Sequence, residues 1–233
     1  MLYLHVKASF AAFRTLTAGS YRPTALFITP SAAYGFLMNI AGVETRWDDG
    51  EEPITLTAAG TPSLEVAIGA VSFPERQTIY QQLHNYPVGS SAKGREEICW
   101  GNKYNIQPIR REFLSGIEAC IGVKGDEGTE VKIRKGLKGA YNGTRYGVLF
   151  LGDNSFMPDI VCEVAEPIEA HWFVKLPRDS SGPKDRLCRL TTSINRTDMS
   201  RTEAPLFYPI EKRKAEIPGD SWCRVGPLDI SDG

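Results

Sequence analysis

The sequence predicts an α+β fold built on a ferredoxin-like, or RRM-like, sheet, and three observations carry that prediction. Residues 2–7 alternate between apolar and polar side chains, as a strand with one buried face does. Residues 30–42 space their apolar side chains as an amphipathic helix does. The later segments continue the order strand, helix, strand, strand, helix, strand, which is the order of a ferredoxin-like domain with its helices on one face.

The first strand and the first helix are the clearest elements. Leu2, Leu4 and Val6 share one face of the strand and are expected in the core. Ser31 is the expected N-cap of the helix, and Gly42 is its expected C-terminal stop. The predicted buried stripe of this helix consists of Ala33, Phe36, Leu37 and Ile40.

A polar arm interrupts the predicted sheet. Residues 64–73, 77–86 and 105–121 have strand character, whereas residues 87–104 are polar, glycine-containing and without periodicity. A long polar insertion between two strands predicts a protruding β-hairpin thumb at about residues 86–113.

The C-terminal half continues with shorter elements. A short helix is predicted over residues 127–138, and strands over residues 146–151, 160–164 and 171–176. From residue 177 the chain is polar, contains prolines and shows little periodicity, which predicts an irregular C-terminal extension over residues 177–233.

Composition excludes several classes of protein. The formal net charge of −1 argues against a protein that coats nucleic acid over its whole surface, so any such contact must come from local clusters of Lys and Arg. No segment resembles a signal peptide or a membrane span. The five cysteines form no Cys-x-x-Cys pair and no zinc-type cluster, so we expect no metal, no cofactor and reduced thiols in the cytoplasm.

Catalysis has one weak candidate. The chain has three histidines and lacks the Gly-x-Ser-x-Gly, phosphate-loop and His-Glu-x-x-His patterns. His84 borders the arm near Lys93 and Lys103, so a metal-independent ribonuclease that activates a 2′-hydroxyl is the alternative function. Because no second catalytic group lies at a fixed spacing from His84, we expect no catalytic residue.

Two basic segments predict contact with single-stranded RNA, since cations neutralise phosphates and aromatic rings stack on bases. The other interpretation of both is a solvated basic surface. The cations of the arm and its return strand are Lys93, Arg95, Lys103, Arg110 and Arg111, against Glu96 and Glu97 and interleaved with Tyr86, Trp100 and Tyr104. The second segment, KIRKGLKGAYNGTRY, carries Lys132, Arg134, Lys135, Lys138, Tyr141, Arg145 and Tyr146, and its glycines would let a backbone approach phosphates.

The start of the first helix is a third candidate. A helix N-terminus attracts anions, and Ser31 adds a hydroxyl near Arg14 and Arg22. Tyr34 lies off the apolar stripe and either faces this place or completes the core. Lys7 adds a cation on the polar face of the first strand, the face on which such domains hold unpaired nucleotides.

These residues resemble a known family. The segment KASFAAFRTLTAGSYRPTALFITPSAAYGFLMNIAG, residues 7–42, resembles the opening of CRISPR-associated protein family five, with Ala11–Arg14 and Pro30–Gly35 matching its motifs. VLFLGDNSFMPDIV (148–161) is similar to an apolar strand of that family, and YNIQPIRREFLSG (104–116) is similar to the return strand of its thumb.

The resemblance implies a repeat-associated RAMP-type RNA-binding domain over residues 1–176. It implies a non-catalytic subunit of type I Cascade that binds the 5′ handle of the crRNA, contacts the backbone subunit and the large subunit, and reaches target DNA through the complex. One branch of the family cleaves the precursor RNA with Tyr, Lys and His. Here Lys103 is followed by Tyr104 rather than His, which favours the non-cleaving role.

Overall fold

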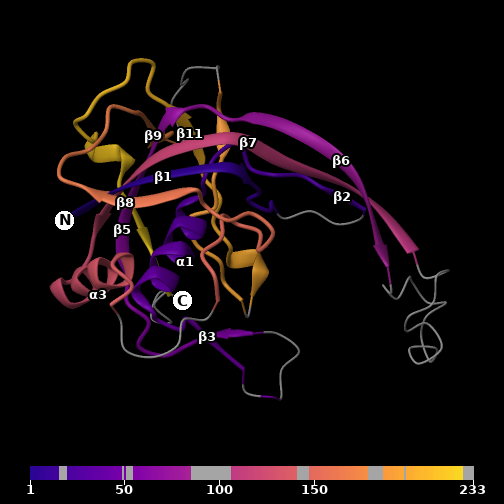
Figure 1. Cartoon of the computed structure of the whole chain (residues 1–233), viewed down its shortest axis with the longest axis horizontal. Coiled ribbons are helices and arrows are strands. Elements are labelled where there is room, and N and C mark those ends of the chain that lie inside the picture. The colour runs from indigo at the N-terminus through magenta and orange to yellow at the C-terminus, as the bar shows by residue number, and fades with distance from the viewer. Residues whose placement is uncertain are drawn as a thin grey trace.

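One large, mostly antiparallel sheet organises the chain, and helices α1 and α3 lie together on one side of it (Figure 1). The computed structural model describes residues 1–15, 20–48, 50, 55–84, 106–140, 147–177, 186–196 and 198–227. In this part of the chain the strands follow the order β10-β11-β9-β5-β7-β1-β8, with β12 beside β5 and both β2 and β6 beside β7. The predicted α+β class is confirmed.

The bounds of the elements agree closely with the predicted segments in the first 140 residues. The helices are α1 (Pro30–Ala41) and α3 (Glu127–Leu137), with short 3-10 turns at Met199–Arg201 and Gly219–Ser221. The strands are β1 (Leu2–Ala11), β2 (Tyr21–Arg22), β3 (Arg46–Trp47), β4 (Leu56–Thr57), β5 (Leu64–Ser72), β6 (Glu75–His84), β7 (Ile106–Lys124), β8 (Ile160–Val164), β9 (His171–Lys175), β10 (Cys188–Arg189), β11 (Leu206–Pro209) and β12 (Cys223–Val225).

Helix α1 packs on α3, β5 and β12, with the buried side that its apolar stripe predicts, but its N-cap is not the predicted Ser31. Thr29 is the cap, because its hydroxyl accepts a hydrogen bond from the Ala32 N–H at 3.2 Å and Pro30 takes the first helical position. The predicted stop at Gly42 is confirmed by its left-handed φ of 66°. Leu2, Leu4 and Val6 of β1 are buried in the same core.

Helices α1 and α3 touch at a glycine. A Cβ built on Gly136 would overlap the backbone carbonyl of Ile40, so only glycine allows this approach. Ile133 of α3 lies fully buried in the shared core. The contact fixes α3 against the C-terminal half of α1.

Strands β6 and β7 form the predicted protruding hairpin, which curves away from the body (Figure 1). Their pairing runs from Glu75↔Ser115 to His84↔Ile106, so the arm begins before the predicted residue 86. The whole predicted polar insertion, residues 87–104, lies outside the described part of the chain, which leaves out residues 85–105.

The C-terminal half departs from the prediction in two places. Residues 147–151 form no strand, and Leu151 makes only an isolated bridge within a tight turn. The predicted irregular extension contributes strands β10, β11 and β12 to the sheet, with β12 paired to β5. Its Trp222 and Ile217 cover Ala67 and Cys120 on the sheet face opposite α1. No described helix is long and apolar enough to cross a membrane.

Candidate nucleic-acid interface

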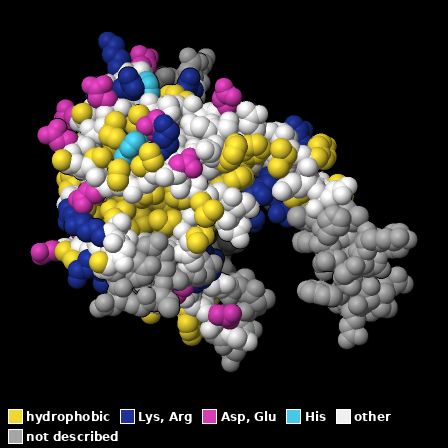
Figure 2. Space-filling view, in the orientation of Figure 1, with side chains coloured by type: hydrophobic (Ala, Val, Ile, Leu, Met, Phe, Trp, Pro, Cys, Tyr) yellow, Lys and Arg dark blue, Asp and Glu magenta, His cyan; other side chains and the backbone are white. Residues whose placement is uncertain are grey.

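A group of arginines and tyrosines gathers where the arm leaves the body. Strand β2 pairs in parallel with β7, which sets Tyr21 beside Arg110 and Arg22 beside Arg111. Figure 2 shows Lys and Arg side chains on the inner side of the arm where it meets the body. We call this group the arm-root cluster, and its members are Arg14, Tyr21, Arg22, Arg76, Tyr80, Arg110 and Arg111.

Two buried carboxylates, Glu112 and Asp153, contact residues of the arm-root cluster. Glu112, 6% exposed, accepts a 2.6 Å hydrogen bond from the Tyr21 hydroxyl and lies 3.7 Å from the Arg76 guanidinium. Asp153, 8% exposed, lies 2.6 Å from Arg111 and 3.8 Å from Arg14. Each carboxylate therefore positions cations: Arg14 and Arg76 stay 67% and 54% exposed, whereas Arg111 is 14% exposed.

The protonation of this cluster follows from those contacts. Burial by itself would raise the pKa of Asp153, but the Ser155 backbone N–H and the Arg111 guanidinium stabilise the carboxylate and hold its pKa below the usual range. The hydrogen bond to Glu112 raises the pKa of the Tyr21 hydroxyl, so that group stays protonated and continues to donate. Arginine is charged at any physiological pH.

Aromatic rings stand beside these cations. Tyr80 is 78% exposed and lies directly opposite Arg110 in the β6–β7 ladder. The Arg110 guanidinium lies 5.3 Å from the centre of the Tyr21 ring, and Arg111 lies 5.1 Å from that of Phe156. Guanidinium groups for phosphates and an open ring for a base are the components of a single-strand interface.

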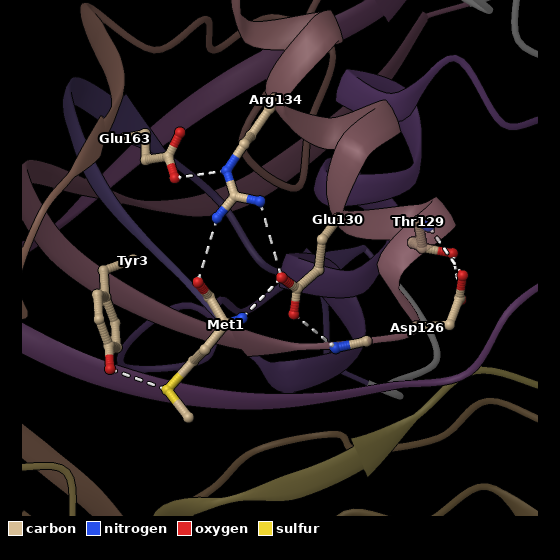
Figure 3. Close-up of polar contacts among 8 residues, drawn as sticks. Met1, Tyr3, Asp126, Thr129, Glu130, Arg134 and Glu163 are labelled. Atoms are coloured by element: carbon tan, nitrogen blue, oxygen red, sulfur yellow. Dashed lines mark hydrogen bonds and ion pairs between the residues drawn. The ribbon is translucent and has the colours of Figure 1, made fainter.

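The second predicted segment begins in α3, and its described residues do not form a free basic surface. The Arg134 Nε donates to Glu163 at 2.8 Å, and the same guanidinium lies 3.9 Å from Glu130 and donates to the Met1 carbonyl at 3.3 Å (Figure 3). Gly136 packs against α1 and is unavailable to approach a phosphate chain. The predicted contacts Lys132, Lys135 and Lys138 are exposed on α3.

Two further predicted residues, Lys7 and Tyr34, are engaged elsewhere. Lys7 lies 3.7 Å from Glu118, which also contacts the His5 ring at 2.8 Å, so this part of the sheet face is not purely basic. Tyr34 donates to the Pro62 carbonyl at 2.7 Å, and burial raises its pKa to about 12. That hydroxyl anchors a neighbouring loop.

The remaining predicted contacts lie outside the described residues. These are Lys93, Lys103, Tyr141, Arg145 and Tyr146, and the side chain of His84 is likewise not described. Sequence reasoning missed Tyr21, Arg76 and Tyr80. The period-two spacing of Arg76 and Tyr80 on one strand was the available signal, since it places both on one face. Among the described residues, no group of His, Cys, Asp and Glu side chains has the arrangement of a metal site.

Comparison with known proteins identifies the family. The model of the CRISPR-associated protein (Cas_Cas5) family matches residues 1–177 of this chain. The chain belongs to this family. Its fold is similar to that of a chain from a solved structure described as "CRISPR RNA-guided surveillance complex", with a TM-score of 0.55, 16% identity, and coverage of 94% of this chain and 95% of the other.

A second solved structure, described as "Crystal structure of Cas protein", matches with a TM-score of 0.41 and 16% identity, over 91% of this chain and 93% of the other. No curated protein matches the sequence. The family assignment and the arm-root cluster are therefore the two findings from which a function is inferred.

Proposed function

We propose that this family member is a non-catalytic subunit of a type I Cascade complex that holds the 5′ handle of the crRNA at the root of its arm. The observation that carries the proposal is the arm-root cluster of five arginines and two tyrosines, of which Arg14, Arg76, Arg111 and Tyr21 contact the two buried carboxylates. A chain of net charge −1 that concentrates arginines at one place favours a local anionic ligand over general coating.

The chemistry of the cluster favours a single strand. Guanidinium groups contact phosphate oxygens without reading sequence, whereas an exposed ring such as Tyr80 stacks on a base only where that base is unpaired. A double helix would keep its bases stacked on one another and leave the ring unused. The proposed ligand is therefore an unpaired segment such as the handle.

Two further points support this assignment. The order β1, α1, β5, β7, α3, β8 matches the β-α-β-β-α-β order of a ferredoxin-like RAMP domain, to which β6 and the first half of β7 add the arm. The similar fold found in an RNA-guided surveillance complex favours a place beside other subunits. The proposal accordingly includes contacts with the backbone and large subunits, indirect action on target DNA, and a cytoplasmic location.

Co-purified RNA tests the proposal. The tagged chain is expressed with its partner subunits and a repeat array, and the bound RNA is sequenced; we expect a guide with a constant 5′ end. Replacing Arg76 and Arg110 together by Ala should lower the slope of log affinity against log salt by about 1.4, because each phosphate contact on a single strand contributes about 0.7. The matched control replaces two exposed cations of the C-terminal extension, Lys212 and Arg213, by Ala.

Either of two results contradicts the proposal: no defined RNA in the complex, or equal salt slopes for the arm-root variant and the control. The nuclease alternative has its own assay. The isolated chain is incubated with repeat RNA in EDTA, and we expect no cleavage. Cleavage that disappears in His84→Ala would assign the alternative function instead.

A further inference from the structure

A cleft runs along the outer side of α1, beside the arm-root cluster. Ser31, Gly35 and Asn39 follow one another at intervals of four residues and form one wall of this cleft of about 380 Å³. The opposite walls come from residues 43–46, 150–152 and 194–196. A Cβ built on Gly35 would meet no atom within 4 Å, so the absence of a side chain there leaves open space rather than serving packing.

Two buried polar atoms beside this cleft have no partner in the described part of the protein. Asn39 is 9% exposed; its Nδ2 donates to the Val148 carbonyl at 3.5 Å, but its Oδ1 accepts nothing. Ser193 is 7% exposed and its Oγ also lacks a partner. Ser193 lines an adjoining cavity of about 110 Å³ that shares Ser31 and Gly35 with the cleft. Leaving such an atom unpaired costs about 1–3 kcal/mol, so a ligand that pairs with it is strongly favoured.

The rest of the lining combines apolar and charged side chains, among them the Glu44–Arg46 ion pair. Phe36 and Phe150 give the cleft an apolar wall, against which a flat base can pack. Arg14 and Arg196 supply positive charge at its lining. Arg14 also contacts Asp153 of the arm-root support, so the cleft and the arm-root cluster share a cation and can be followed by one strand.

The geometry points to a socket that holds one unpaired nucleotide of the bound RNA and selects a base with an amino group. This inference rests on the proposed function, since the nucleotide belongs to the strand held at the arm root. With its Nδ2 already donating, Asn39 offers one acceptor, Oδ1. The N4 amino group of cytosine or the N6 amino group of adenine donates to it, whereas uracil presents an oxygen at the matching position and is repelled.

The test compares cytosine with uracil, because the two bases have the same shape. Fluorescein-labelled eight-nucleotide oligo(C) and oligo(U) are titrated with the purified full chain at one salt concentration. We expect oligo(C) to bind about three- to tenfold more tightly than oligo(U), because one hydrogen bond contributes about that factor to affinity. In Asn39→Leu, which keeps the side-chain volume and removes the acceptor, this preference should disappear.

Gly35→Leu fills the cleft from a position with free space around it, and should weaken binding of both oligonucleotides at least fivefold. Gly219→Leu is the matched control, because a Cβ at Gly219 also meets nothing within 4 Å and that residue lies outside the cleft. The arm-root variant with Arg76 and Arg110 replaced should weaken both oligonucleotides while keeping the preference for cytosine. Thermal melts check that each variant folds.

Distinct results overturn the two proposals. If Gly35→Leu binds both oligonucleotides as the wild type does, the socket is wrong while RNA binding at the arm root stands. If Gly35→Leu instead prevents association with the partner subunits and leaves the base preference unchanged, the cleft receives a protein side chain and the socket is again wrong. If the wild type binds neither oligonucleotide and the complex carries no RNA, the proposed function fails and the socket fails with it.

Discussion

Helix α3 and the arm root are both rich in cations, yet the fold uses those cations differently. On α3, Arg134 is 39% exposed and pairs with Glu163 of a neighbouring strand, which is 34% exposed, and with the buried Glu130 of its own helix. At the arm root the buried Glu112 and Asp153 also pair with arginines, of which Arg14 and Arg76 are 67% and 54% exposed and Arg111 is 14% exposed. Because both regions contain a buried carboxylate, they differ in how far their paired arginines are exposed.

The arm leaves the body on the side away from α3 (Figure 1). The lysines of α3 stay exposed, and their contribution to RNA binding is a separate prediction from that of the arm root. The following experiments test the contrast, from the largest expected effect to the smallest.

The largest effect on stability is expected at Gly136 of α3. Gly136→Leu should lower the free energy of unfolding by about 3 kcal/mol or more, because its side chain would overlap the Ile40 carbonyl and force the helices apart. Urea denaturation measures this. Gly35→Ala, a change in the other helix at a position with free space, should be neutral or stabilising by up to about 1 kcal/mol. Equal effects would show that Gly136 does not serve close packing.

The next effect compares one arginine from each region. Arg111→Ala should cost about 3 kcal/mol, since it leaves the buried Asp153 carboxylate without its nearest cation. Arg134→Ala should cost less than about 1 kcal/mol, because its pair with Glu163 is partly exposed to water and the buried Glu130 keeps the Met1 ammonium group at 2.6 Å. Both values come from urea denaturation at the same pH. A larger loss for Arg134→Ala would invert the comparison.

A smaller, pH-dependent effect should appear at Asp153. Its pKa in the folded state lies below the ordinary value, so the carboxylate contributes stability above a pH of about 4, the unfolded-state pKa, and loses it as the pH falls through the folded-state pKa. The advantage of the wild type over Asp153→Asn should therefore be full at pH 6 to 7 and shrink steadily below about pH 4. An advantage that does not change with pH would mean that the carboxylate is not stabilised by its neighbours.

The smallest effect is expected from the lysines of α3. Replacing Lys132 and Lys135 together by Ala should change the salt slope of RNA binding by less than about 0.3, against about 1.4 for the arm-root pair. Both variants remove two positive charges, so the comparison separates local contact from overall charge. A slope change as large as that of the arm-root pair would extend the interface to α3.

Much of the fold follows from local pattern. The alternation in β1, the apolar stripe of α1 and the stop at Gly42 predict the observed elements, because strand and helix periodicities are properties of neighbouring residues. The hairpin follows in the same way from a polar insertion between two strand-like segments. Of the candidate site, Arg14, Arg22, Arg110 and Arg111 were predicted, and the structure brings these four together.

The rest depended on contacts between residues far apart in the chain. Thr29, and not Ser31, is the helix cap. Both residues carry a hydroxyl, so the local sequence does not decide between them. The direction in which the chain enters α1 sets which hydroxyl reaches the free N–H groups. Residues 147–151 were predicted as a strand, yet they run as a turn-containing segment in which the Ala12 N–H donates to the Leu151 carbonyl.

The sequence by itself determined the class of the fold, the order of its elements and the family, since these follow from periodicity and short motifs. Only the tertiary structure decided which charges face outward. Glu163 reaches Arg134 across 29 positions and Asp153 reaches Arg111 across 42, and no local pattern encodes such pairings. Whether a cation is free to meet a phosphate depends on the nearest carboxylate in space, because Coulomb energy falls with distance through space and not along the chain.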